Sequence, residues 1–153
     1  VKPNAISISA HQPGGALTGA TPDGRKGGEI LADASISPSH GKDLRGPLAV
    51  FQSAMRIQQD QYQGTLFNMK FHPSVLKTSA DLNKLAGLIR TYLTHGGKHI
   101  QFNVVDREEM LDAQAHPEEH PELTVRAAGY SAYFTRLPKS IQDEVIERTS
   151  QAL

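Results

Sequence analysis

The feature that most limits the fold is the composition of residues 11–46, HQPGGALTGATPDGRKGGEILADASISPSHGKDLRG. This segment is dense in Gly, Pro, Ser and Asp and has few apolar runs, so we expect mostly turns, one of them at Pro22, Asp23 and Gly24. A segment of this length without regular structure is uncommon inside a small independent domain. It therefore indicates either a functional loop or burial against protein that lies outside this sequence.

After this segment, helix and strand signals alternate. Residues 46–57 carry apolar side chains spaced three and four residues apart, which predicts a helix. Residues 64–71, GTLFNMKF, alternate as a strand does, with Leu66, Asn68 and Lys70 on one face and phenylalanine and methionine on the other.

A second helix and strand follow. The next apolar face begins after Thr78 or Ser79, either of which can cap a helix, and two consecutive glycines end it. Residues 99–105, HIQFNVV, are rich in β-branched and aromatic side chains and predict another strand. Strand, helix, strand and helix in succession predict an α/β fold with parallel strands.

Two more helices complete the prediction. Asp106 is expected to be an N-cap, with Glu109 completing a capping box. The terminal helix is expected to begin near Pro138 and to keep one apolar side that includes Leu153.

The composition excludes several classes of partner. The chain has 153 residues, of which 38% are hydrophobic, and equal numbers of acidic and basic side chains give it a formal net charge of zero. No excess charge therefore steers it toward nucleic acid or an anionic membrane. There is no apolar run long enough to span a bilayer and no signal-peptide pattern, so we expect a cytoplasmic protein.

Cysteine is absent, which excludes disulfides, thiolate metal sites and a cysteine nucleophile supplied by this chain. Two short motifs imitate functional sites. Residues 19–26, GATPDGRK, have the spacing of a phosphate-binding loop but lack its Lys-Ser/Thr ending, and residues 116–120, HPEEH, match a zinc peptidase pattern in a segment confined by prolines. We interpret both as turns and predict no cofactor-binding or metal-binding residues.

The stretch TVRAAGYSAYF, residues 124–134, resembles the glycyl radical signature of the glycyl radical enzymes, which include pyruvate formate-lyase and the glycerol, diol and choline lyases. Segments around TPDGRK, GTLFNMKF, HIQFNVVDREEM and QDEVIERT are similar to that family in the same order. One departure is Ala127, where the signature usually has valine. The resemblance implies the C-terminal portion of a ten-stranded β/α barrel that is incomplete without a larger partner. Residues 1–60 would supply its loop region and one helix, and residues 61–153 the remaining elements.

The resemblance assigns the radical to Gly129. A Cα radical is stabilised when the carbon flattens between its amide and carbonyl neighbours, and only glycine has no side chain to crowd that geometry. Arg126 and Tyr130 are implied to hold the loop or to be recognised by the activating enzyme, and Phe134 to anchor it. The family's radical is installed by a separate iron–sulfur activating enzyme that uses S-adenosylmethionine, and it is destroyed by oxygen.

In that family the glycyl radical passes to a cysteine, and the resulting thiyl radical attacks a small-molecule substrate. Because this sequence has no cysteine, the resemblance implies a large cysteine-containing partner. The chain is then a subunit or domain of a radical lyase that breaks C–O, C–N or C–S bonds, in the cytoplasm or within a bacterial microcompartment. Two alternatives stay open: a spare part that replaces a damaged radical domain, and a noncatalytic binding module.

Overall fold

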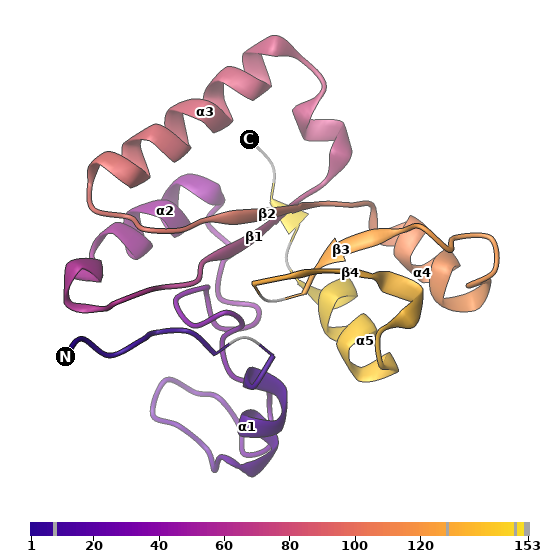
Figure 1. Ribbon diagram of the computed structural model, residues 1–153, viewed down its shortest axis with the longest axis horizontal. Coiled ribbons are helices and arrows are strands. Elements are labelled where there is room, and N and C mark those ends of the chain that lie inside the picture. The colour runs from indigo at the N-terminus through magenta and orange to yellow at the C-terminus, as the bar shows by residue number, and fades with distance from the viewer. Residues whose placement is uncertain (8, 128, 149, 152–153) are drawn as a thin grey trace.

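A parallel sheet lies at the centre of the computed structural model, which describes residues 1–7, 9–127, 129–148 and 150–151. Strand β1 (Asn68–Phe71) lies between β2 (Gln101–Val104) and β5 (Ser150–Gln151) (Figure 1). Asn68 pairs with Gln101 in the first ladder and Lys70 with Ser150 in the second, and both ladders are parallel. The predicted α/β fold with parallel strands is confirmed.

Both faces of β1 are covered. Phe67, Met69 and Phe71 pack into the main core with α2 (Pro47–Met55) and α3 (Ser79–Thr94). Leu66, Asn68 and Lys70 face the opposite side, as the alternation predicts, and Asn68 and Lys70 are buried there beneath the C-terminal elements. A strand buried on both faces usually carries apolar side chains on both, so the polar side chains on this face need specific partners.

The predicted caps form, with one difference in detail. Thr78 caps α3 and exchanges hydrogen bonds with Asp81 in a capping box. Asp106 caps α4 (Arg107–Ala115), but its carboxylate accepts from the backbone N–H of Glu108 at 2.9 Å, and Glu109 makes no reciprocal bond. The N-cap is confirmed and the second capping box was wrong.

A second core lies beside the sheet. The hairpin of β3 (Thr124–Arg126) and β4 (Ser131–Tyr133) packs with α4 and α5 (Lys139–Glu147) around buried apolar side chains (Figure 1). Its fully buried members include Met110, Val125, Phe134 and Val145.

The prediction of one long terminal helix was wrong. Helix α5 begins after Pro138 as expected but ends at Glu147, because Arg148 takes an extended conformation that leads into β5. Leu153, expected on the apolar side of this helix, lies outside the described residues. After Arg148, residues 150–151 form β5 at the edge of the sheet. The spacing of apolar residues in the sequence does not predict this strand pairing.

The N-terminal segment is mostly turns, as predicted, and Gly24 N–H donates to Thr21 O at 3.0 Å in the expected turn. The short helix α1 (His11–Leu17) is an exception. It packs so closely on residues 29–31 that a Cβ on Gly15 would lie 2.4 Å from the carbonyl oxygen of Glu29. Tertiary contact therefore outweighs the poor helix propensity of a sequence with two glycines. Two single-turn helices, η1 (Gln59–Gln61) and η2 (Pro73–Leu76), flank β1, and a third, η3 (Phe134–Arg136), follows β4.

Within the residues that the structure describes, none of the helices is both long enough and apolar enough to cross a membrane.

Candidate functional site

Gly129 lies at the tip of the β3–β4 hairpin. The hairpin pairs Val125 with Ala132 and Arg126 with Ser131, and the N–H of Ala127 donates to the carbonyl of Tyr130 at 3.0 Å to close the tip. Gly129 has φ +81°, a left-handed conformation that side chains disfavour. The turn alone therefore accounts for a glycine at this position, so the backbone conformation does not by itself indicate a radical site.

Gly129 is exposed and has one close neighbour in the direction that a side chain would take. The residue is exposed, and a Cβ added to it would contact only the side chain of Leu66, with Cδ1 at 3.2 Å. Leu66 comes from the segment that leads into β1, on the face predicted from the alternation. In the direction of an added Cβ, the nearest group beyond the adjoining residues is therefore the flexible end of the Leu66 side chain.

The other predicted site residues lie along the same hairpin. Arg126 donates from its guanidinium to the Ser131 hydroxyl at 2.9 Å, across the two strands. The side chain of Tyr130 is 39% exposed beside Gly129. Phe134 is fully buried at the base of the hairpin, where its N–H donates to Leu123 O at 2.7 Å. The structure brings Arg126, Gly129 and Tyr130 together at the tip and leaves Phe134 in the core beneath them.

Asn103, which was not predicted, holds the first strand of the hairpin. Its carboxamide accepts from the Arg126 N–H at 2.6 Å and donates to the Arg126 carbonyl at 2.7 Å. The side chain of a β2 residue thereby imitates a neighbouring strand, with one donor and one acceptor. Asn103 is buried, so both of its polar atoms depend on this contact.

Arg148 also holds the Arg126 carbonyl, together with the carbonyl of Ala127. Its guanidinium donates to Arg126 O at 3.2 Å and to Ala127 O at 2.8 Å. Asn68 extends toward the same Ala127 oxygen at 3.5 Å. The backbone of Arg126 and Ala127 is therefore fixed by side chains from three separate places in the sequence: β1, β2 and the end of α5.

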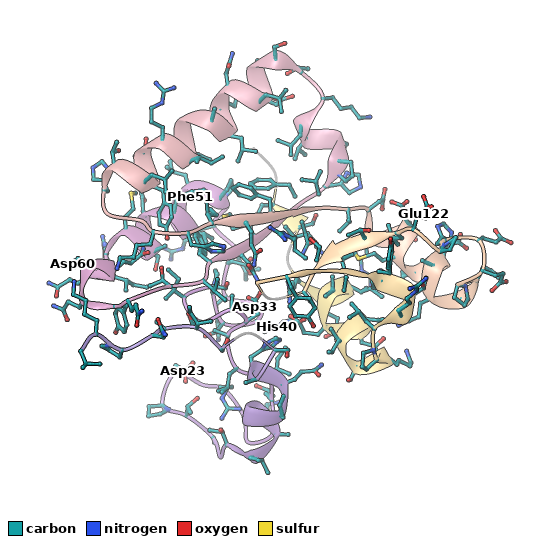
Figure 2. The ribbon with its side chains drawn as sticks, in the orientation of Figure 1. Asp23, Asp33, His40, Phe51, Asp60 and Glu122 are labelled. Carbon is teal, nitrogen blue, oxygen red and sulfur yellow. The ribbon has the colours of Figure 1, made fainter. Side chains whose placement is uncertain are left out.

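Two carboxylates hold Arg148 from its other side. Glu144 makes a two-pronged contact with it at 2.7 and 2.8 Å, and Asp33 lies 3.4 Å away. Asp33 comes from the N-terminal segment and lies near the middle of the molecule (Figure 2). His11, also from that segment, lies 3.7 Å from Glu144. The glycine-rich segment is thus used to build the floor beneath the hairpin.

Burial and pairing shift the ionisation of this group. Burial alone would raise the pKa of Glu144, but hydrogen bonds from His11 and Arg148 outweigh it and lower the pKa to about 2. Burial alone would lower the pKa of the Arg148 guanidinium. Its contacts with Glu144 and Asp33 outweigh this effect and raise the pKa. Burial lowers the pKa of Lys70 to about 8, although its ammonium donates to the carbonyls of Val145 and Ile146 at the end of α5. At neutral pH the hairpin therefore rests on paired, buried charges.

The two segments that imitate a phosphate-binding loop and a zinc peptidase motif, residues 19–26 and 116–120, are turns, as interpreted. Arg25 donates to backbone carbonyls within its own loop, including Thr18 O at 3.2 Å, so it braces that loop from within. His116 and His120 both contact the carboxylate of Asp112, at 3.0 and 2.7 Å. No cluster suited to a metal ion occurs among the residues that the structure describes.

Replacing Asn103 with leucine is expected to lower the free energy of unfolding by about 2 kcal/mol, because the Arg126 N–H would lose its partner while staying largely shielded from water, and the Arg126 carbonyl would keep its bond from Arg148 but lose that from Asn103. Urea denaturation measures this change. Asn83→Leu is the matched control, since Asn83 is exposed on α3 and should change stability little. An equal loss of unfolding free energy in the two variants would show that the Asn103 contact stabilises the fold no more than an exposed side chain does.

Comparisons with known proteins agree with the signature in the hairpin. A family model described as glycine radical matches residues 32–135. The chain is 47% identical over 147 residues to the 4-hydroxyphenylacetate decarboxylase glycyl radical subunit of Clostridioides difficile, covering 96% of this chain. It is 46% identical over 145 residues to the indoleacetate decarboxylase of Tractidigestivibacter scatoligenes, covering 95% of this chain. In each case it spans only 16% of the relative's length.

The fold comparison gives the same result. The glycerol-bound form of the B12-independent glycerol dehydratase from Clostridium butyricum superposes with a TM-score of 0.94 at 47% sequence identity. The match covers 99% of this chain and 19% of the dehydratase. The mixed α/β architecture therefore resembles the glycyl radical enzyme fold. With the family match, the signature and the superposition in agreement, the chain belongs to the glycyl radical enzyme family and contains its glycyl radical domain.

Proposed function

We propose that this chain is the radical-carrying part of a glycyl radical lyase and stores an unpaired electron on the Cα of Gly129. The observation that carries the proposal is the position of this glycine. It lies exposed at a hairpin tip, within the family's signature, and has no side chain to crowd a flattened carbon.

The radical would form by transfer of one hydrogen atom. A 5′-deoxyadenosyl radical, made from S-adenosylmethionine by an iron–sulfur activating enzyme, takes the hydrogen from Gly129 and becomes 5′-deoxyadenosine. The unpaired electron is left on the Cα, shared with the adjoining amide and carbonyl. Arg126 and Tyr130 lie beside this carbon and are the residues that we propose hold the loop or contact the activating enzyme, with Phe134 anchoring the hairpin.

Use of the radical requires a thiol from protein outside this sequence, because the chain has no cysteine. The thiol would return a hydrogen atom to Gly129 and become the thiyl radical that attacks the substrate. We propose that the larger portion also completes the barrel against this chain. Large apolar side chains left exposed on α2 and α3, among them Leu48, Leu82 and Leu93, support such a contact.

The lengths of the relatives favour one arrangement of that larger portion. The region matched here makes up 16 to 18% of curated relatives that are themselves long single chains, including one named a glycyl radical subunit. This supports a domain of a longer polypeptide over a small subunit of its own. The same fold could also serve as a spare part for a damaged enzyme.

We propose a class of bond cleavage for this protein and name no single substrate. Similar relatives include decarboxylases and dehydratases, and the identity is 47% both to a decarboxylase subunit and to the glycerol dehydratase structure. Elimination of a C–O, C–N or C–S bond in a small polar substrate is our proposal, and the cysteine-containing portion would select the substrate. Cytoplasmic location and packaging in a microcompartment stay predictions.

Anaerobic activation tests the radical directly. The chain is incubated with an activating enzyme from a glycyl radical system and S-adenosylmethionine, with and without a cysteine-containing partner, and electron paramagnetic resonance is recorded. A doublet signal supports the proposal. Absence of a radical under all of these conditions, with the same activating enzyme active on its own substrate, would favour the noncatalytic binding module.

Exposure to oxygen gives a second expected result. Oxygen adds to a carbon-centred radical and breaks the backbone there, so the activated chain should be cleaved at Gly129 into one large and one small fragment. Mass spectrometry locates the break. Chain that has been mixed with the activating enzyme but without S-adenosylmethionine should stay intact, and cleavage at another residue would place the radical elsewhere.

A further inference from the structure

The backbone that leads into β1 is held by a side chain at a point where a parallel ladder would use a backbone carbonyl. In the ladder between β1 and β2, Asn68 is paired with Gln101, and the Gln101 N–H donates to Phe67 O at 2.9 Å. One further step of this pattern would bring the Phe67 N–H to the carbonyl of His99. Instead, the Phe67 N–H donates to Nδ1 of the His99 imidazole at 3.3 Å, and the His99 carbonyl accepts from the Tyr92 hydroxyl at 3.2 Å. The imidazole therefore takes the place of a backbone acceptor at the start of the sheet.

This hydrogen bond fixes both the charge and the tautomer of His99. An imidazole nitrogen accepts a hydrogen bond only when it carries no proton, so Nδ1 is bare and the proton of the neutral ring lies on Nε2. A doubly protonated ring donates from both nitrogens and cannot accept from the Phe67 N–H. Phe67 is fully buried, so water does not replace the lost acceptor unless the backbone moves. The contact therefore exists only while the ring is neutral.

The surroundings of the ring favour its neutral form. The pKa of His99 is lowered from 6.5, first by burial and then by the positive charge of Arg126 on β3. Tyr92 of α3 is a neutral neighbour, because burial raises its pKa above 10, and the ammonium of Lys98 donates to the carbonyl of Tyr62. A lowered pKa means that the stabilisation by the neutral ring is complete above pH 6.5 and is lost as the pH falls through the lowered value.

The backbone that His99 holds carries the side chain that lies against Gly129. Leu66 Cδ1 lies 3.2 Å from the position that a Cβ on Gly129 would take. The Leu66 N–H donates to Ala5 O at 3.3 Å, and its carbonyl accepts from the Ile36 N–H at 3.1 Å. His99 supplies the bond to the next amide along the chain. The position of Leu66 against the hairpin tip therefore depends on His99.

We propose that His99 is a positioning residue whose neutral imidazole holds the Leu66–Phe67 backbone against Gly129 and makes this support sensitive to acid. Protonation removes the acceptor for the Phe67 N–H and places a second cation near Arg126, and both changes weaken the support. The purpose of the contact rests on the proposed function, because it affects a radical only if Gly129 carries one. The contact itself can be measured without a radical.

Nuclear magnetic resonance of the intact chain, with isotope-labelled histidine nitrogens, measures the tautomer and the protonation of His99 directly. We expect a proton on Nε2 and none on Nδ1 in neutral solution, and half-protonation below pH 6.5. Arg126→Gln should move half-protonation to higher pH, because it removes a neighbouring positive charge. Arg136→Gln, on η3, is the matched control and should leave it unchanged. A proton on Nδ1, or half-protonation at or above pH 6.5, would overturn the proposal.

Two substitutions separate the acceptor from the charge when hydrogen exchange of the Phe67 amide is measured. Asparagine keeps an oxygen acceptor near the place of Nδ1 and does not titrate, so His99→Asn should keep the Phe67 amide protected. His99→Leu removes the acceptor, and the Phe67 amide should then exchange about tenfold faster at neutral pH, the factor expected for one hydrogen bond.

The matched control is His95→Asn, at the exposed C-cap of α3, which should leave Phe67 exchange unchanged. Equal acceleration at Phe67 and at Met110 of α4 in His99→Leu would mean general destabilisation and would overturn the proposal. An unchanged Phe67 rate in His99→Leu would overturn it as well.

Decay of the stored radical distinguishes this proposal from the proposed function. After anaerobic activation, the doublet of the unmodified chain should decay faster relative to that of His99→Asn as the pH falls below 6.5, because only the unmodified chain loses the support of Leu66 in acid. No radical in either chain, with the expected resonance and exchange results, would support the role of His99 in holding this backbone and reject the proposed function. A ratio of decay rates that does not change with pH would overturn the positioning role and leave the proposed function standing.

Discussion

Replacing Gly129 with alanine is expected to abolish the radical completely and to leave the fold in place. A methyl group would crowd the planar arrangement that stabilises a Cα radical, and it would press on Leu66 Cδ1 at 3.2 Å. The positive φ of +81° adds a backbone cost of about 1 to 2 kcal/mol. The variant should therefore unfold at slightly lower urea concentration and give no doublet in electron paramagnetic resonance.

Gly28→Ala separates the two effects. Gly28 has φ +83°, and a Cβ there would meet no atom within 4 Å. This variant should lose a similar amount of stability and keep the full radical signal. A doublet of undiminished intensity in Gly129→Ala would contradict the assignment of the radical to this carbon.

Acid is expected to lower the free energy of unfolding by about 3 kcal/mol, because Glu144 in the floor of the site becomes protonated. The pKa of its carboxyl is about 2 in the folded chain, below the ordinary value of 4.5. A lowered pKa stabilises the fold fully above about pH 4.5, and this contribution is lost progressively as the pH falls from there through 2. Urea denaturation at a series of pH values should show this loss of unfolding free energy.

Glu144→Gln identifies the source of that dependence. The variant should be less stable at pH 7, because the buried guanidinium of Arg148 loses a charged partner, and its stability should fall less steeply in acid. Glu109→Gln, at an exposed position of α4, serves as the matched control and should follow the unmodified chain. Parallel pH curves for Glu144→Gln and the unmodified chain would show that Glu144 is not the titrating group.

Local sequence patterns predicted much of the scaffold. Caps at Thr78 and Asp106 depend on side chains within three residues, so they can be recognised without the fold. The alternation of β1 predicted a polar face correctly, since successive side chains of a strand point to opposite sides. Gly129 was predicted as the radical position because its signature is contiguous in the sequence, and this assignment stays a prediction.

The floor of the site could not be predicted in the same way. Arg148 follows a charged stretch of α5 and resembles an exposed helix residue, yet it contacts Asp33, which is more than a hundred positions away in the sequence. Asn103 is one polar letter in a strand, and nothing local indicates that it will bind the backbone of Arg126. Buried polar side chains on a strand face do give a signal, because each must have a partner, but the sequence does not say which one.

The most direct test of the central claim is electron paramagnetic resonance of activated chain in which glycine carries deuterium on its Cα. The single hydrogen left on a glycyl radical splits the signal into a doublet, and deuterium couples far more weakly. The account predicts a doublet from ordinary chain that collapses to one unresolved line in the deuterated chain and is absent in Gly129→Ala. A doublet that survives deuteration would contradict it, since the radical would then lie on a residue other than glycine.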